Sequence, residues 1–159
     1  MESTMSDNNA EDKFDSFLGA LSQAMGCGKL APEKDGRVLF GIDGSMGVII
    51  ERGEAEDLGR DAAIVSILIG RPDLDDAGLL GELLMGNYMW AASGEGTLAI
   101  DRDTGILVIH KAFDLAALPS ELVDIFASMV SAARYWQPRL EHAGVQDGGV
   151  PAEAMDIRV

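Results

Sequence analysis

The side chains that most often perform catalysis or bind metal ions are scarce in this sequence. His110 and His142 are its only histidines, and neither has cysteines or carboxylates around it at a metal-ligand spacing. Cys27 is the only cysteine, so it has no partner for an internal disulfide, and a free cysteine is more often a small buried apolar residue than a nucleophile. We therefore expect neither a catalytic residue nor a metal site among them.

Two loops have part of the pattern of a ligand-binding loop. Glycines recur between positions 41 and 47, but no lysine follows in the frame of a phosphate loop, and the segment lies between expected strands. Asp101 and Asp103 begin like a calcium loop, yet its twelfth position is Ala112, which has no carboxylate. Both loops are interpreted as hairpin turns, and the sequence predicts no cofactor.

The chain is strongly acidic. It has 159 residues, with 27 acidic against 12 basic side chains and a formal net charge of −15. This charge repels phosphate backbones and anionic lipid headgroups, so nucleic acid and membrane surfaces are poor partners, although the charge also serves solubility. Adjacent carboxylates such as those of Asp75 and Asp76 lack the apolar cover that a general acid or base needs. We expect that the protein is not an enzyme.

Apolar runs in the sequence are short. The run from Ile64 to Ile69 falls far below the roughly 20 apolar residues that cross a bilayer. The chain opens without the pattern of a signal peptide, and its single cysteine suits a reducing compartment. We therefore expect a cytoplasmic protein.

The spacing of apolar residues predicts an α+β fold in a single domain over residues 11–142, with an antiparallel sheet packed with helices. The predicted order is helix, three strands, helix, two strands, helix. Expected strands cover 37–43, 46–52, 62–69, 97–101 and 106–113, and expected helices cover 11–25, 75–90 and 119–140. Residues 1–10 are expected to be a disordered lead-in, and 143–159 a flexible acidic tail.

Several residues mark the ends of these elements. Gly26 and Gly28 are expected to end the first helix in a left-handed conformation. Asp75 and Asp76 suit the positive end of the dipole at the start of the second helix. Pro138 is expected to disturb the end of the last helix.

The helix expected at 75–90 is apolar around nearly its whole circumference, with a polar strip only at Glu82 and Gly86. Such a helix needs cover on two sides. Large apolar surfaces are seldom left exposed on a soluble monomer, so we predict a homodimer through this helix. The candidate interface residues are Leu79, Leu80, Leu83, Leu84, Asn87 and Tyr88.

Three stretches carry a resemblance to a known family. The first, Leu83–Tyr88, is similar to a Leu-Leu-x-x-Asn-apolar pattern. In the second, Gly96–Asp101 is followed by Asp103–Gly105 and a second strand. The third is the final helix, which has Trp136 near its end. Over Phe14 to Leu140 the chain resembles the Tir chaperone (CesT-like) family, the class I chaperones of type III secretion effectors. The likeness lies in the order of these motifs along the chain.

The glycines of the middle helix depart from the family pattern. Gly78, Gly81 and Gly86 lie inside it, and each interior glycine costs up to about 1 kcal/mol relative to alanine. A close approach between helices would account for them.

The resemblance implies a homodimer that binds the N-terminal segment of an effector, which wraps as an extended chain around apolar patches of the first helix and the sheet. Such a chaperone keeps its effector soluble and secretion-competent through binding alone, without ATP. The first hairpin is expected at one end of the sheet, where an exposed edge can accept an incoming strand. The candidate effector contacts are Phe14, Phe17, Val38, Phe40, Ile42, Val48 and Ile50, and at least half of them are also expected to form the core.

Two other functions stay open at this stage. A regulatory or scaffold dimer of the same fold would bind a folded secretion-system or regulatory protein, and a small enzyme would have a site that the sequence does not reveal. A chaperone is expected to bind an isolated segment of roughly 50 to 100 residues in an extended interface, whereas a scaffold needs a folded surface.

Overall fold

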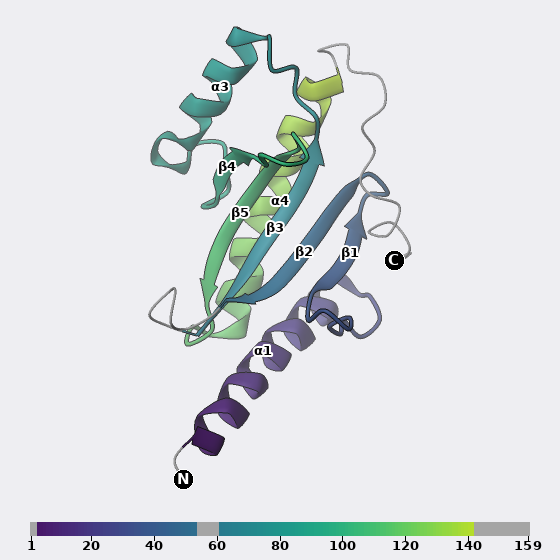
Figure 1. Cartoon of the computed structure of the whole chain (residues 1–159), viewed down its shortest axis with the longest axis vertical. Coiled ribbons are helices and arrows are strands. Elements are labelled where there is room, and N and C mark those ends of the chain that lie inside the picture. Colours follow the sequence, from purple (N-terminus) through teal and green to yellow (C-terminus); the bar gives the residue numbers. More distant parts are fainter. Residues whose placement is uncertain (1–2, 54–60, 142–159) are drawn as a thin grey trace.

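The structure is a computed structural model that describes residues 3–53 and 61–141 of the chain (Figure 1). Its elements are α1 (Ser3–Met25), β1 (Val38–Ile42), β2 (Met46–Gly53), β3 (Ala62–Gly70), α3 (Ala77–Asn87), the short 3₁₀ helix η1 (Tyr88–Trp90), β4 (Thr97–Ile100), β5 (Leu107–Asp114) and α4 (Pro119–Glu141). This order confirms the predicted α+β succession of helices and strands. His142 and the tail expected at 143–159 lie outside the described residues.

The strands of the described residues form one antiparallel sheet in the order β1-β2-β3-β5-β4. β3 is central, which suits its apolar residues on both faces, and β1 is at one edge, as predicted for the first hairpin. Directly opposite residues share a face of the sheet, so they show which face carries the core. One buried row crosses every strand, through Phe40, Val48, Ile67, Ile109 and Leu98.

α1 and α4 cover this buried face. Figure 1 shows α4 running behind the sheet along β3 and β5, while α3 lies beyond β4. The ring centroids of Phe17 in α1 and Phe113 in β5 are 5.5 Å apart, and those of Phe40 in β1 and Phe126 in α4 are 6.2 Å apart. Aromatic pairs at these distances add to the stability from burial. α1 and α4 therefore form one layer and the sheet the other.

Local hydrogen bonds set two helix ends. Gly26 follows α1 with φ of 64°, and the N–H of Cys27 donates to the carbonyl of Ser22 at 3.1 Å, which is the bonding of a Schellman motif. This confirms Gly26 as the residue that ends α1. At the start of α3, the carboxylate of Asp76 accepts from the N–H of Leu79 at 3.0 Å and caps the helix.

One helix begins well before the sequence predicts, and another continues through a proline. α1 begins at Ser3, within the segment 1–10 that was expected to be disordered; this segment contains no glycine or proline to interrupt a helix. α4 continues through Pro138 to Glu141; the proline removes one helical N–H donor, and it lies only three residues from the end of the helix. No helix within 3–53 and 61–141 is long and apolar enough to cross a membrane.

α3 ends earlier than the sequence predicts, at Asn87 instead of Trp90. The amide of Asn87 donates through Nδ2 to the carbonyl of Leu98 at 3.0 Å, and the N–H of Leu98 donates to Oδ1 at 2.8 Å. This pairing ties the end of α3 to β4. The chain then turns, with Met89 at φ of 52° and Trp90 at φ of 56° in the left-handed region.

Candidate functional site

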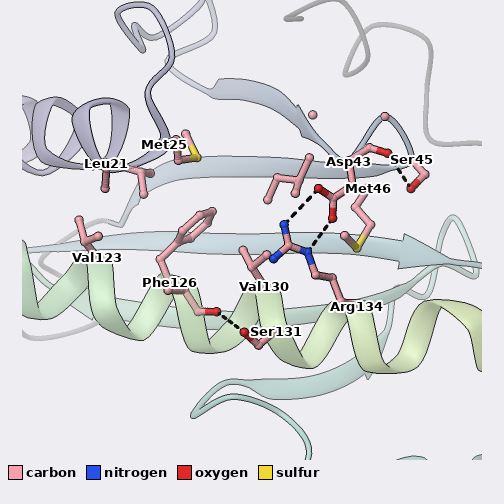
Figure 2. A pocket seen from close by; sticks show the side chains of 15 residues that line it. Leu21, Met25, Asp43, Ser45, Met46, Val123, Phe126, Val130, Ser131 and Arg134 are labelled. Atoms are coloured by element: carbon pink, nitrogen blue, oxygen red, sulfur yellow. Dashed lines mark hydrogen bonds and ion pairs between the residues drawn. The ribbon is translucent and has the colours of Figure 1, made fainter. Parts of the chain in front are cut away.

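An apolar groove lies between the C-terminal end of α1, the β1–β2 turn and α4, and we call it the α1–α4 groove. Its volume is about 720 Å³, and Figure 2 shows side chains from all three segments around it. The lining consists of Leu21, Ala24 and Met25 of α1, Gly41 to Met46 of the first hairpin, and Val123, Phe126, Ala127, Val130, Ser131 and Arg134 of α4.

Small side chains keep the mouth of the groove open. Ala127 and Ser131 lie one turn apart on α4 and are exposed, and Ala24 of α1 is exposed as well. The volume falls within the range of about 300–1,000 Å³ that is usual for ligand pockets. Because most of the lining is apolar, the groove can take apolar side chains from another chain.

One ion pair spans the groove. Nε of Arg134 donates to Oδ2 of Asp43 at 2.7 Å, and Nη2 donates to Oδ1 at 3.1 Å, so that α4 is joined to the β1–β2 turn (Figure 2). Nearby, Nε2 of Gln137 donates to Oγ of Ser45 in the same turn at 2.6 Å. The mouth of the groove is therefore crossed by polar contacts above an apolar floor.

The charges of this pair balance each other. The hydrogen bond from Arg134 holds the pKa of Asp43 below its ordinary value, and the same bond raises the pKa of Arg134. Both side chains are therefore ionised at neutral pH. The other residues that line the groove are uncharged, so the rim is neutral overall although the chain has a net charge of −15.

Of the effector contacts predicted from the sequence, one lines this groove and the others face the core. Ile42 is half-buried and lines the groove. The buried members are Phe14, Phe17, Val38, Phe40, Val48 and Ile50. At least half of the set was expected to form the core, and these buried residues do so. They also support the elements that form the groove.

Sequence reasoning missed the α4 side of the groove and the charged pair at its rim. Val123, Ala127 and Ser131 recur at every fourth position and form a stripe along α4. The exposed small residues on this stripe were the sequence signal that could have indicated the α4 side of the groove. Asp43 and Arg134 are 91 residues apart, and no local spacing rule connects them.

A second feature is an exposed apolar surface on α3 and η1, which we call the α3 patch. Its residues are between 58% and 77% exposed: Leu84, Met85, Tyr88, Met89 and Trp90. The left-handed backbone at Met89 and Trp90 is a conformation that large side chains seldom adopt outside functional or tightly constrained sites. An apolar patch of this kind is suited to contact with another protein surface.

The structure divides the predicted dimer residues between two sides of α3. The inward group packs on the core or bonds to β4, and the outward group belongs to the α3 patch. The inward group is Leu79, Leu80, Leu83 and Asn87, and the outward group is Leu84 and Tyr88. The sequence did not identify Met85, Met89 and Trp90 as interface candidates.

The residues considered for chemistry are dispersed. His110 is exposed on β5, and the half-buried Cys27 contacts the carbonyl of Ser22, with Sγ at 3.7 Å from the oxygen. In the part of the chain that the structure describes, no three His, Cys, Asp or Glu side chains are grouped so that they could hold a metal ion.

Comparison with protein families gives one match that covers most of the chain. The model of the Tir chaperone protein (CesT) family matches residues 16–137, a range that includes the groove and the α3 patch. No curated protein matches the sequence.

Several solved structures have the same fold at low sequence identity. The HopA1–SchA chaperone–effector complex contains a chain 17% identical, with a TM-score of 0.62, covering 79% of this chain and 94% of that chain. The ExsC–ExsE complex gives 20% identity and a TM-score of 0.65, over 81% of this chain and 94% of that chain. The ExoU–SpcU complex from the type III secretion system of Pseudomonas aeruginosa gives 19% identity and a TM-score of 0.61, over 79% and 98%.

Proposed function

The chain belongs to the Tir chaperone protein (CesT) family, so it is a chaperone of type III secretion effectors, and we propose that it holds the N-terminal segment of its effector as an extended chain. The segment lies along the edge of β1 and places large apolar side chains in the α1–α4 groove. Binding alone keeps the effector soluble and secretion-competent, without ATP. The observation that carries this proposal is an apolar groove next to an edge strand.

The geometry of β1 supports this mode of binding. Among the described strands, β1 has a neighbour only on its β2 side, and its residues Gly41 and Ile42 line the groove. An added strand hydrogen-bonds to such an edge through its main chain, and alternate side chains enter pockets beside it. A strand at β1 would therefore direct every second side chain toward the helix layer, where the groove is.

We also propose that the chaperone is a homodimer joined through the α3 patch. Leu84 and Tyr88 are 74% and 77% exposed, and burial against a second copy would remove them from water. Asn87 anchors the end of α3 to β4, so the patch is presented on a fixed support.

We expect this function to need no catalysis, metal ion or nucleotide, and to be carried out in the bacterial cytoplasm. The support is the chaperone family and a mode of binding that depends on apolar burial and main-chain hydrogen bonds.

The test begins with the effector itself. Co-purification from the native host followed by mass spectrometry identifies the partner, and calorimetry then measures binding of its isolated N-terminal segment. Ala127→Leu fills the groove from an exposed position and is expected to weaken this binding at least about tenfold. Ala116→Leu is the matched control, because Ala116 is exposed and does not line the groove.

Two results would point elsewhere. Binding that requires the folded effector would favour a regulatory or scaffold dimer. If Ala127→Leu binds the segment as tightly as the parent protein does, the effector uses another surface.

A further inference from the structure

We propose that the Arg134–Asp43 ion pair is a strap that sets the width of the α1–α4 groove and so positions the β1 edge for effector binding. This inference rests on the proposed function of the groove. Arg134 and Asp43 are positioning residues in it, because they act on the effector through the turn that they hold.

The strap joins two parts of the fold that the groove separates. α4 packs mainly on α1, β3 and β5, whereas the β1–β2 turn lies across the groove from it. Deep in the fold, the ring contact between Phe40 and Phe126 connects β1 with α4. At the mouth, the connection consists of the paired bonds from Arg134 to Asp43 and the bond from Gln137. A two-bonded guanidinium–carboxylate pair fixes orientation as well as distance.

The turn itself does not require a carboxylate at position 43. Asp43 and Gly44 have φ of 54° and 70°, and the N–H of Ser45 donates to the carbonyl of Ile42 at 3.2 Å. These features match a type I′ hairpin turn, in which asparagine is as suitable as aspartate at the first position. The charge of Asp43 is therefore explained by Arg134, and Asp43→Asn removes that charge without a change in the backbone preference.

Because both side chains of the pair are exposed, the pair can hold the turn in place while contributing little to the stability of the fold. The side chains of Arg134 and Asp43 are 55% and 44% exposed. Exposed ion pairs contribute little to global stability, so the strap can open while the domain stays folded. Opening frees the turn and loosens the wall of the groove. A bound segment is then released faster, since changes within one interface act mainly on the dissociation rate.

The experiment uses three variants of the full chain: Asp43→Asn, Arg134→Gln and the double variant. Each single change is expected to speed dissociation of the effector's N-terminal segment by up to about fivefold. The double variant should lose no more than either single variant, because one change already opens the strap. Melting temperature and dimer mass should stay at parental values. Hydrogen exchange on the free variants should show faster exchange of the amides at positions 43 to 46.

The matched control is the Arg37–Asp35 pair. Its side chains are 44% and 47% exposed, its closest contact is 2.7 Å, and neither residue lines the groove. Arg37→Gln should leave both the dissociation rate and the exchange of the turn unchanged.

Other outcomes would contradict the proposed role of the Arg134–Asp43 ion pair. Loss of binding in Arg134→Gln without any loss in Asp43→Asn would mean that Arg134 contacts the effector directly. Parental dissociation and parental exchange in both single variants would mean that the pair positions nothing. If the parent protein does not bind the segment, the proposed function fails, and the exchange measurement on the free chaperone still tests the strap by itself.

Discussion

Gly86 of α3 lies against the indole ring of Trp136 in α4. A Cβ atom at position 86 would be 2.9 Å from Cζ2 of Trp136 and 3.0 Å from Cδ1 of Leu98. Trp136 is buried, and its Nε1 donates to the carbonyl of Ala92 at 2.7 Å, so the ring cannot move aside freely. The close approach of the two helices therefore requires glycine at this position.

Two glycine variants test this contact with opposite expected signs. Gly86→Ala should lower the free energy of unfolding by about 1–3 kcal/mol, because the added methyl group overpacks the contact with Trp136. Gly81→Ala, on the same helix, meets no atom within 4 Å and should raise it by up to about 1 kcal/mol through helix propensity. Urea denaturation measures both changes. A Gly86→Ala variant as stable as Gly81→Ala would contradict the close contact.

The α3 patch predicts which exposed residues control dimerisation. Tyr88→Asp places a charge in the proposed interface and should produce a monomer at micromolar concentration, as measured by light scattering. Since Tyr88 is exposed in the single chain, circular dichroism of this variant should remain that of the parent protein. Leu118→Asp is the control: Leu118 is 63% exposed but lies outside the patch, and this variant should remain a dimer. Dimeric Tyr88→Asp would place the interface elsewhere.

The hydrogen bonds of Asn87 predict a coupling between α3 and β4. Asn87→Ala leaves the N–H and the carbonyl of Leu98 without their side-chain partner, and it should cost about 1–3 kcal/mol of stability. Thermal denaturation measures this loss, and weaker dimerisation should accompany it because the support of the α3 patch is loosened. Asn87→Asp keeps the acceptor for the N–H of Leu98 but sets a carboxylate oxygen against the carbonyl of Leu98 in place of the donor, so it should lose at least as much. Equal stability of Asn87→Ala and the parent would refute the coupling.

The ion pair at the groove predicts a titration in acid. Because Arg134 holds the pKa of Asp43 below the ordinary 3.8, the pair is present above that value and is lost as the pH falls through the lowered pKa. NMR titration of the Asp43 carboxyl should show its midpoint move up toward 3.8 in Arg134→Gln. Asp101 is the control, because hydrogen bonds from Thr104 lower its pKa, and its midpoint should not move. An unchanged Asp43 midpoint would mean that the pair does not form in solution.

The hairpins could be predicted from the sequence because their signals are local. Turn residues with positive φ, such as Gly44 and Gly105, separate strands that pair with each other, and alternation of apolar residues defines which face is buried. The pairing of β3 with β5 is different. It joins strands with α3 and β4 between them in the sequence, and no local pattern specifies it.

The site was only partly predictable for a similar reason. The helix at α3 is apolar on nearly all sides, so periodicity could not separate the inward Leu83 from the outward Leu84. The end of α3 was also misplaced, because the bonds from Asn87 to Leu98 depend on β4, which follows later in the chain. Prediction succeeded where contacts are close in sequence and failed where tertiary contacts decide.

The groove and the α3 patch lie at opposite edges of the sheet, since β1 lines the groove and α3 packs on β4. Neighbouring strands are about 4.8 Å apart, so the distance across the sheet from β1 to β4 is roughly 19 Å. A twofold axis at the α3 patch lies beyond β4, so it would place the two grooves of a dimer at least roughly 40 Å apart, which takes at least about 12 residues of extended chain to span. An effector whose apolar anchors are separated by at least that many residues can occupy both grooves, with one effector per dimer. On the proposed mode of binding, an effector with closer anchors would fill one groove per molecule, so the spacing of its anchors would set the stoichiometry of the complex.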